Sequence, residues 1–177
     1  MNWHESLLRR PDELQTWMGN LGFSGDVAAE CAQKLNAYVE RNKERLSRID
    51  GDALVYSIDG HGENALYSEG KLQFIDILFP AARWRWTTEE YDIFRLGTDI
   101  FALTGEKNFN AYLGGAKKIY QDFDETDKDF YLLYCAALDG CVLKTLAKSK
   151  PEKEKQLQKY YEWFLERLRT FKPEYKV

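Results

Sequence analysis

The chain has 177 residues, of which 44% are hydrophobic and 31% are charged, and its formal net charge is −4. This length allows one domain with a buried core, and the composition is ordinary for a soluble globular protein. The acidic balance argues against a dedicated nucleic-acid binder, which would carry a basic patch. We therefore expect a single domain over residues 1–177 and no nucleic acid among its partners.

The first part of the chain is predicted to be helical. Residues 2–21 are predicted to form one or two helices, since apolar side chains recur at helical spacing and Pro11-Asp12-Glu13 has the pattern of a helix start. A longer helix is expected from about residue 24 to residue 49, with apolar positions at a period near 3.6 and charge on the opposite face. A turn at 50–52 and a short strand at 53–56 follow.

The segment 56–79 holds the main candidate site residues. It is predicted to be a polar loop followed by two short strands, 64–67 and 71–75, around a turn at 68–70. Asp59, Asn64 and Asp76 lie on it. Magnesium binds carboxylates, side-chain amides, water and phosphate oxygens, and phosphoryl transfer also uses a carboxylate near the accepting hydroxyl. Alternatively, Asp59 and Asn64 form turns and Asp76 caps a strand.

An irregular, bulky and partly basic segment, 77–86, comes next, and the β-structure is expected to end before it. Arg83 and Arg85 could face a phosphate or an acidic substrate, or they could pair with nearby acids. Trp84 and Trp86 are expected to pack rather than to stack on a ligand.

The rest of the chain is predicted to be helical. Thr87 and Glu90 form a capping pattern for a helix over 91–105, and Asp92 is an acid in its first turn, where the helix dipole favours negative charge. Further helices are expected at 108–123, 126–149 and 151–171. The predicted fold class is mainly α with a small β-element, that is, an α+β helical bundle.

The cysteines and the aromatic residues suggest a reducing compartment and a bulky core. Cys31, Cys135 and Cys141 are too few and too scattered for a disulfide framework, and none forms a zinc-type pair. We expect reduced core thiols in a cytoplasmic protein without membrane contact, because no stretch approaches the length of a span. The five Trp, eleven Tyr and ten Phe residues fill a core or line a ligand or partner surface.

Two motifs resemble a known superfamily. Asp59-Gly60-His61-Gly62-Glu63-Asn64 resembles the catalytic loop, His-Gly-Asp-x-His-x-x-Asn, of the aminoglycoside phosphotransferase and choline kinase branch of the protein-kinase-like superfamily. Phe74-Ile75-Asp76 resembles the strand and metal-binding aspartate that follow this loop. The stretch 92–105 is similar to the buried helix of the kinase C-terminal lobe, whose pattern is Asp-x-Trp-x-Leu-Gly with a Thr-Gly end. The family's leading His-Gly is Ser57-Ile58 in this chain.

The resemblance implies roles for several residues and a need for ATP and Mg²⁺. Asp59 would be the catalytic base, Asn64 and Asp76 the Mg²⁺ ligands, and His61 the second histidine of the loop. Asp92 would brace the loop through its backbone amides. Arg83 or Arg85 follows the metal aspartate, where this superfamily places substrate segments.

The resemblance covers residues 25–105 by motif and one lobe of two. The residues before Asp59 contain no Gly-rich strand-turn-strand and no Val-Ala-x-Lys strand, which a nucleotide lobe would supply. Without that lobe, weak nucleotide binding is expected. An apolar inter-lobe face would favour a homo-oligomer or a partner protein.

Three hypotheses follow from the sequence. The first is a phosphotransferase for a small hydroxylated molecule, with the nucleotide site completed by a partner or a second copy. The second is a catalytically inactive, kinase-derived binding or regulatory module, that is, a pseudokinase, which acts by protein–protein contact. The third is an unrelated helical domain with a coincidental motif.

Overall fold

The computed structural model describes residues 3–49, 55–56, 61–69, 71–74, 86–120 and 123–173, and most of them are helical. This confirms the mainly α class. The helices are α1 (Trp3–Asn20), α2 (Gly25–Arg41), α3 (Lys43–Leu46), α4 (Glu89–Thr104), α5 (Glu106–Ile119), α6 (Lys128–Ala147) and α7 (Glu154–Thr170). Two 3-10 turns are η2 (Gly62–Asn64) and η3 (Pro151–Lys153), and four short strands are β1 (Val55–Tyr56), β2 (Ala65–Ser68), β3 (Lys71–Phe74) and β4 (Trp86–Thr87).

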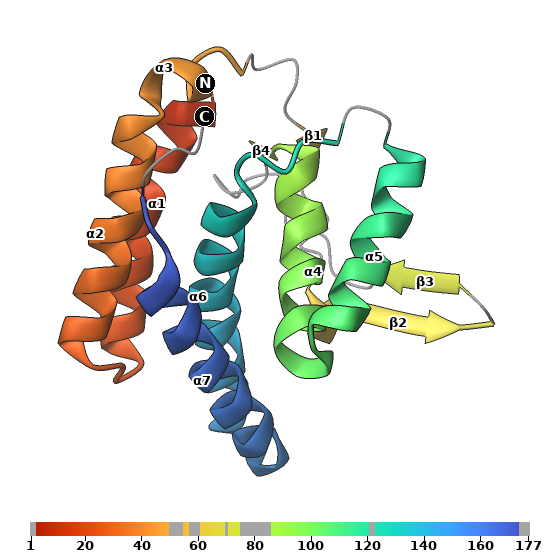
Figure 1. The fold of residues 1–177 in the computed structure, drawn as a ribbon. Helices are drawn as coiled ribbons and strands as arrows, with labels where there is room; N and C mark the ends of the chain where they lie inside the picture. The colour runs from red at the N-terminus through yellow and green to blue at the C-terminus, as the bar shows by residue number, and fades with distance from the viewer. Residues whose placement is uncertain are drawn as a thin grey trace.

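Helix α6 lies in the middle of the bundle, in contact with α1, α2, α4 and α7 (Figure 1). From Phe130 to Cys141 every residue is buried, so this part of the helix is apolar on nearly every face. Contrary to the expectation that no stretch approaches the length of a span, α6 is, among the described residues, the one helix long and apolar enough to cross a membrane, but 72% of that apolar window is buried inside the protein. Burial against neighbouring helices accounts for its apolar composition without a membrane.

The core is one continuous cluster that the helices on both sides of α6 share, and its largest buried side chains are mostly aromatic. The core interpretation of the aromatic excess is confirmed for these residues: Tyr134, Tyr160, Phe94, Phe109, Phe130 and Phe164. The prediction of reduced core thiols also agrees with the structure, because Cys31, Cys135 and Cys141 are buried and unpaired with one another. Burial raises the pKa of the Cys31 thiol to about 12, which keeps it protonated.

Of the two alternatives for residues 2–21, the single helix is confirmed as α1, and the helix start at Pro11 is wrong because Pro11 lies inside that helix. Proline lacks an N–H and cannot complete the helical hydrogen bond at its own position. Leu7 and Leu14, two turns apart on one face, are both buried against the core. Their burial keeps the helix continuous across the proline.

The single helix predicted for 24–49 is divided at Asn42 into α2 and α3. The buried Asn42 side chain donates from Nδ2 to the carbonyl oxygen of Tyr38 at 2.9 Å, and the Asn42 backbone N–H donates to the same oxygen at 3.1 Å. Asparagine competes in this way with regular helical hydrogen bonding. The break therefore has a local side-chain cause that apolar periodicity does not report.

The start of α4 also differs from the prediction. The N-cap is Thr88 rather than Thr87, since the Thr88 hydroxyl accepts from the Tyr91 N–H at 3.3 Å. Thr87 instead belongs to β4, which pairs antiparallel with β1 in the register Val55↔Thr87 and Tyr56↔Trp86. The prediction that strand structure ends before residue 77 is thus wrong, because a two-residue strand carries no detectable alternation.

The remaining elements agree with the sequence apart from their ends. β2 and β3 form the predicted hairpin, and Glu69 in its turn has a φ of 52°. Helix α5 begins at Glu106, two residues earlier than expected, and α6 spans 128–147 within the predicted 126–149. Pro151 opens η3, which leads into α7 as expected from its first-turn preference.

Gly97 allows α4 and α5 to approach each other closely. A Cβ at this position would lie 3.0 Å from Phe109 Cε2 and 3.2 Å from Tyr112 Cε1. We expect Gly97→Ala to be less favourable than Gly114→Ala by about 1–3 kcal/mol, because overpacking costs that much. The gain in helix propensity is common to both positions and cancels.

Urea unfolding of the two alanine variants measures this difference. Gly114 is the matched control, since it lies on a helix and a Cβ there would meet nothing within 4 Å. Equal free energies of unfolding would show that the helices separate without cost.

Candidate functional site

The described part of the predicted catalytic loop lies against α4. His61 is buried, with 6% of its surface exposed, and its carbonyl oxygen accepts from the Asn64 N–H at 3.0 Å. This hydrogen bond closes the η2 turn. Asn64 is half-buried and ends the turn, directly before β2. The loop therefore passes into the hairpin β2–β3 without an intervening linker.

Asp99 of α4 holds this loop. Its Oδ2 accepts a hydrogen bond from the backbone N–H of Gly62. A Cβ on Gly62 would lie 3.0 Å from the same oxygen, so glycine permits the close approach. Asp99 is itself buried, with 8% of its surface exposed, and a buried carboxylate needs such partners.

The surroundings of Asp99 set its protonation. Burial raises the pKa of the Asp99 carboxyl, and the Gly62 hydrogen bond, the Tyr160 hydroxyl, His61 and Arg95 lower it only in part. The Tyr160 hydroxyl lies near enough to act on the carboxylate, although it makes no hydrogen bond of normal geometry. The net effect is that Asp99 holds its proton to a higher pH than an exposed aspartate does.

This raised pKa predicts a pH dependence of stability. The unfolded-state pKa is about 3.9, so the folded protein binds the Asp99 proton more tightly than the unfolded chain does. The stabilisation is complete below the unfolded-state pKa and is lost as the pH rises through the folded-state pKa. We expect the stability of the wild type relative to Asp99→Asn to fall from about pH 4 towards neutral pH.

Urea unfolding across this pH range is the measurement. Asparagine keeps an oxygen that can accept from the Gly62 N–H but does not titrate. Asp129→Asn, which changes an exposed acid in the first turn of α6, is the control. Its difference in stability from the wild type should not depend on pH. A wild-type advantage that grows with pH would contradict the raised pKa.

A buried chain of polar groups continues from Asp99 into the bundle. Arg95, one turn earlier on α4, forms an ion pair from Nη2 to Asp139 Oδ1 of α6 at 3.0 Å, and its Nη1 donates to the Tyr91 hydroxyl at 3.1 Å. Arg10 of α1 lies over the Tyr91 ring, 5.5 Å from its centroid. Three helices thus contribute charged or polar side chains to one buried network that reaches the loop.

The structure describes some of the predicted site residues and not others. Asp59, Asp76, Arg83 and Arg85 lie outside the described residues, as do Ser57 and Ile58. His61 and Asn64 are brought together in the η2 turn. Asp92 is half-buried in the first turn of α4, seven residues before Asp99 and hence on the same helix face.

Asp99 contacts the loop, and the sequence analysis missed this residue. The signal for it was a lone acid inside the apolar part of α4, between Thr98 and Ile100. Such an acid requires a buried partner. The sequence does not show that the partner is a backbone amide of the loop.

Metal binding at this site depends on residues beyond the described set. Within the part of the chain that the structure describes, no group of three or more His, Cys, Asp or Glu side chains could hold a metal ion. Asn64 offers one amide oxygen, which suits a hard cation but needs carboxylate partners. The donor chemistry fits Mg²⁺ if Asp59 and Asp76 complete the set.

No protein-family model, curated protein or solved structure matches the chain. The candidate site therefore stands on its own residues and on their contacts.

Proposed function

We propose that the chain is a kinase-like C-terminal lobe of the aminoglycoside phosphotransferase type, which transfers phosphate from ATP to a small hydroxylated acceptor. The observation that carries the proposal is the contact between Asp99 of α4 and the Gly62 amide. It holds a loop of the pattern Asp-x-His-x-x-Asn against a buried helix that itself carries the second motif. A coincidental match of two motifs would not require them to touch.

The candidate site residues would have separate roles in this reaction. Asp59 would accept the proton of the acceptor hydroxyl, whose oxygen takes the phosphoryl group while ADP leaves. Asn64 and Asp76 would bind Mg²⁺, which when bound neutralises charge on the phosphates. His61 and Asp92 would support the loop, and Arg83 or Arg85 would contact phosphate or substrate.

Hydrogen bonding at the loop supports this division. The Gly62 amide is held by a carboxylate, and the Asn64 amide by the His61 carbonyl oxygen. Phosphoryl transfer depends on positioning and charge stabilisation more than on covalent chemistry by the protein. A loop fixed by a helix suits that requirement.

A partner lobe is part of the proposal. Among the described residues, the elements that precede the loop are helices and the two-residue strand β1. The described strands form only two-stranded pairs. Leu66 on β2 is 49% exposed beside the loop, as expected of a surface that another lobe covers. We propose that a second copy or a partner protein in the cytoplasm completes the nucleotide site there.

The test is a thermal-shift and calorimetric titration with ATP and Mg²⁺ on the wild type and on Asp76→Asn. We expect weak stabilisation of the wild type that requires Mg²⁺ and is abolished in the variant, because one of the two proposed ligands loses its charge. Asp124→Asn, an exposed acid outside the loop, is the control and should bind as the wild type does. Stabilisation that survives Asp76→Asn would refute the assigned site.

The second candidate is a kinase-derived binding module without activity, and the exposure of Leu66 favours it as well. This module would tolerate Asp59→Asn and Asp76→Asn and lose partner binding on Leu66→Asp. If the protein showed neither ATP binding nor concentration-dependent association, both candidate functions would be refuted.

A further inference from the structure

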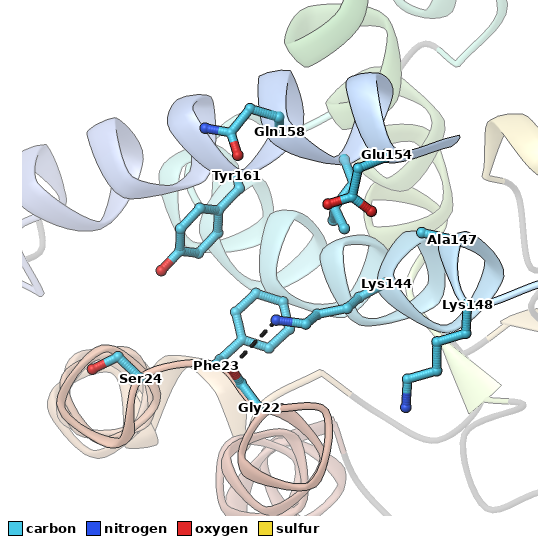
Figure 2. A pocket seen from close by; sticks show the side chains of 10 residues that line it. Gly22, Phe23, Ser24, Lys144, Ala147, Lys148, Glu154, Gln158 and Tyr161 are labelled. Atoms are coloured by element: carbon cyan, nitrogen blue, oxygen red, sulfur yellow. Dashed lines mark hydrogen bonds between the residues drawn. The ribbon is translucent and has the colours of Figure 1, made fainter. Parts of the chain in front are cut away.

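A pocket of about 430 Å³ lies on another part of the molecule, between the α1–α2 turn and the α6–α7 pair (Figure 2). Its lining comes from residues 22–24, the last turn of α6 with Lys148, and the first half of α7. None of these residues belongs to the loop, the hairpin or α4. Its volume is within the range of small-molecule sites.

One wall of the pocket is apolar and aromatic. Phe23 and Tyr161 are in ring contact, with centroids 5.6 Å apart and planes tilted by 53°. Leu157 is buried beside them, and half-buried Ala147 completes the surface. A flat or branched apolar group would replace water favourably against this wall.

Positive charge lies in a fixed position beside this aromatic wall. The Lys144 ammonium donates to the Gly22 carbonyl oxygen at 3.3 Å and lies 4.3 Å from the centroid of the Phe23 ring (Figure 2). These contacts fix the ammonium, which has three donors and uses one on Gly22. Lys148 lies one turn further along α6 and lines the same space.

The remaining polar groups restrict the ligand further. Glu154 lines the pocket, and within the described residues it forms no ion pair with Lys144 or Lys148. The Ser24 hydroxyl, at the start of α2, makes no capping hydrogen bond. Two lysines and one glutamate give the pocket an excess of one positive charge, which suits a single anionic group and disfavours a dianion.

We propose that this pocket binds a small amphiphilic carboxylate, a molecule with an aromatic or branched apolar body and one anionic group. The carboxylate pairs with Lys144, Lys148 adds a second positive charge to the lining, and the apolar body packs against Phe23, Leu157 and Tyr161. Glu154 accepts a hydrogen bond from a hydroxyl or amino group at the far end of the ligand. The inference is independent of the phosphotransferase proposal.

The test is an amide NMR titration of the full chain with 4-hydroxyphenylacetate, which has a carboxylate, an aromatic ring and a hydroxyl donor. We expect saturable binding at one site, with the largest shifts at Phe23, Ala147 and Leu157. Inorganic phosphate and benzyl alcohol, which lack the apolar body and the charge respectively, should each bind at least about tenfold more weakly.

Matched variants separate the pocket from the rest of the surface. Lys148→Gln and Lys144→Gln should weaken binding about tenfold, and Ala147→Leu should block it by filling space. Lys155→Gln, an exposed lysine of α7 outside the lining, should have no effect. Lys148 is itself exposed, so its variant retains the fold even if Lys144→Gln does not.

Three results would overturn the proposal. The first is the absence of saturable binding up to the solubility limit of 4-hydroxyphenylacetate. The second is equal affinity in the wild type, Lys148→Gln and Ala147→Leu. The third is phosphate binding as tight as that of the aromatic carboxylate.

Discussion

Replacement of Asp139 by alanine is expected to destabilise the protein by about 3–5 kcal/mol, because the change leaves the Arg95 guanidinium charged inside the core. The side chains of Arg95 and Asp139 are 6% and 3% exposed, so water cannot replace the lost carboxylate. Domains of this size are stable by only about 5–15 kcal/mol. Leaving one charge of this pair without its partner would therefore remove a large share of the folded state's free-energy advantage.

Urea unfolding followed by far-ultraviolet circular dichroism measures this loss. The control is Asp129→Ala, an exposed acid in the first turn of the same helix, which should cost less than about 1 kcal/mol. The double variant Arg95→Met/Asp139→Leu removes both charges and should recover much of the stability. If Asp139→Ala cost no more than Asp129→Ala, the ion pair would have no structural importance.

The second large effect is expected at Asp99, which acts on the loop through the Gly62 amide. We expect Asp99→Ala to weaken Mg²⁺-dependent ATP binding about 10- to 100-fold, the usual cost of losing a group that orients a metal site. Asp99→Asn keeps an oxygen acceptor and should retain most of the affinity. This prediction rests on the proposed function.

The Asp99 experiment compares the Mg²⁺ concentration that gives half of the maximal thermal shift in the presence of ATP; we call this concentration the Mg²⁺ midpoint. Global stability is recorded in parallel, because a purely structural role would lower stability without moving the Mg²⁺ midpoint. Gly62→Ala is an independent change at the other end of the contact, where the new Cβ would lie 3.0 Å from Asp99 Oδ2. Unchanged midpoints in both Asp99→Ala and Gly62→Ala would show that the contact does not position the loop.

The helical content could be predicted from the sequence, whereas several boundaries could not. Apolar periodicity reports which face is buried, so α4, α6 and α7 were found close to their observed extents. It does not report that Leu7 and Leu14 keep α1 intact across Pro11, or that Asn42 bonds back to Tyr38. These outcomes depend on tertiary burial and on one side-chain hydrogen bond.

The candidate site was predicted in part, for a similar physical reason. The motif located His61 and Asn64, because turn and ligand residues recur at fixed sequence spacing. It pointed to Asp92 as a support of the loop but not to Asp99, two turns further along α4, which accepts from the Gly62 amide. Both aspartates face the same way, and only the three-dimensional position of the loop distinguishes them.

The pairing of β1 with β4 has a consequence for how this protein can change. Val55 lies opposite Thr87, at the N-terminal end of α4 (Figure 1), so the strands that precede and follow residues 57–85 lie side by side. The cost of closing a loop rises only slowly with its length. Insertions and deletions in this segment can therefore alter what the molecule recognises while the helices keep their packing. Specificity can then change during evolution without a large change in stability.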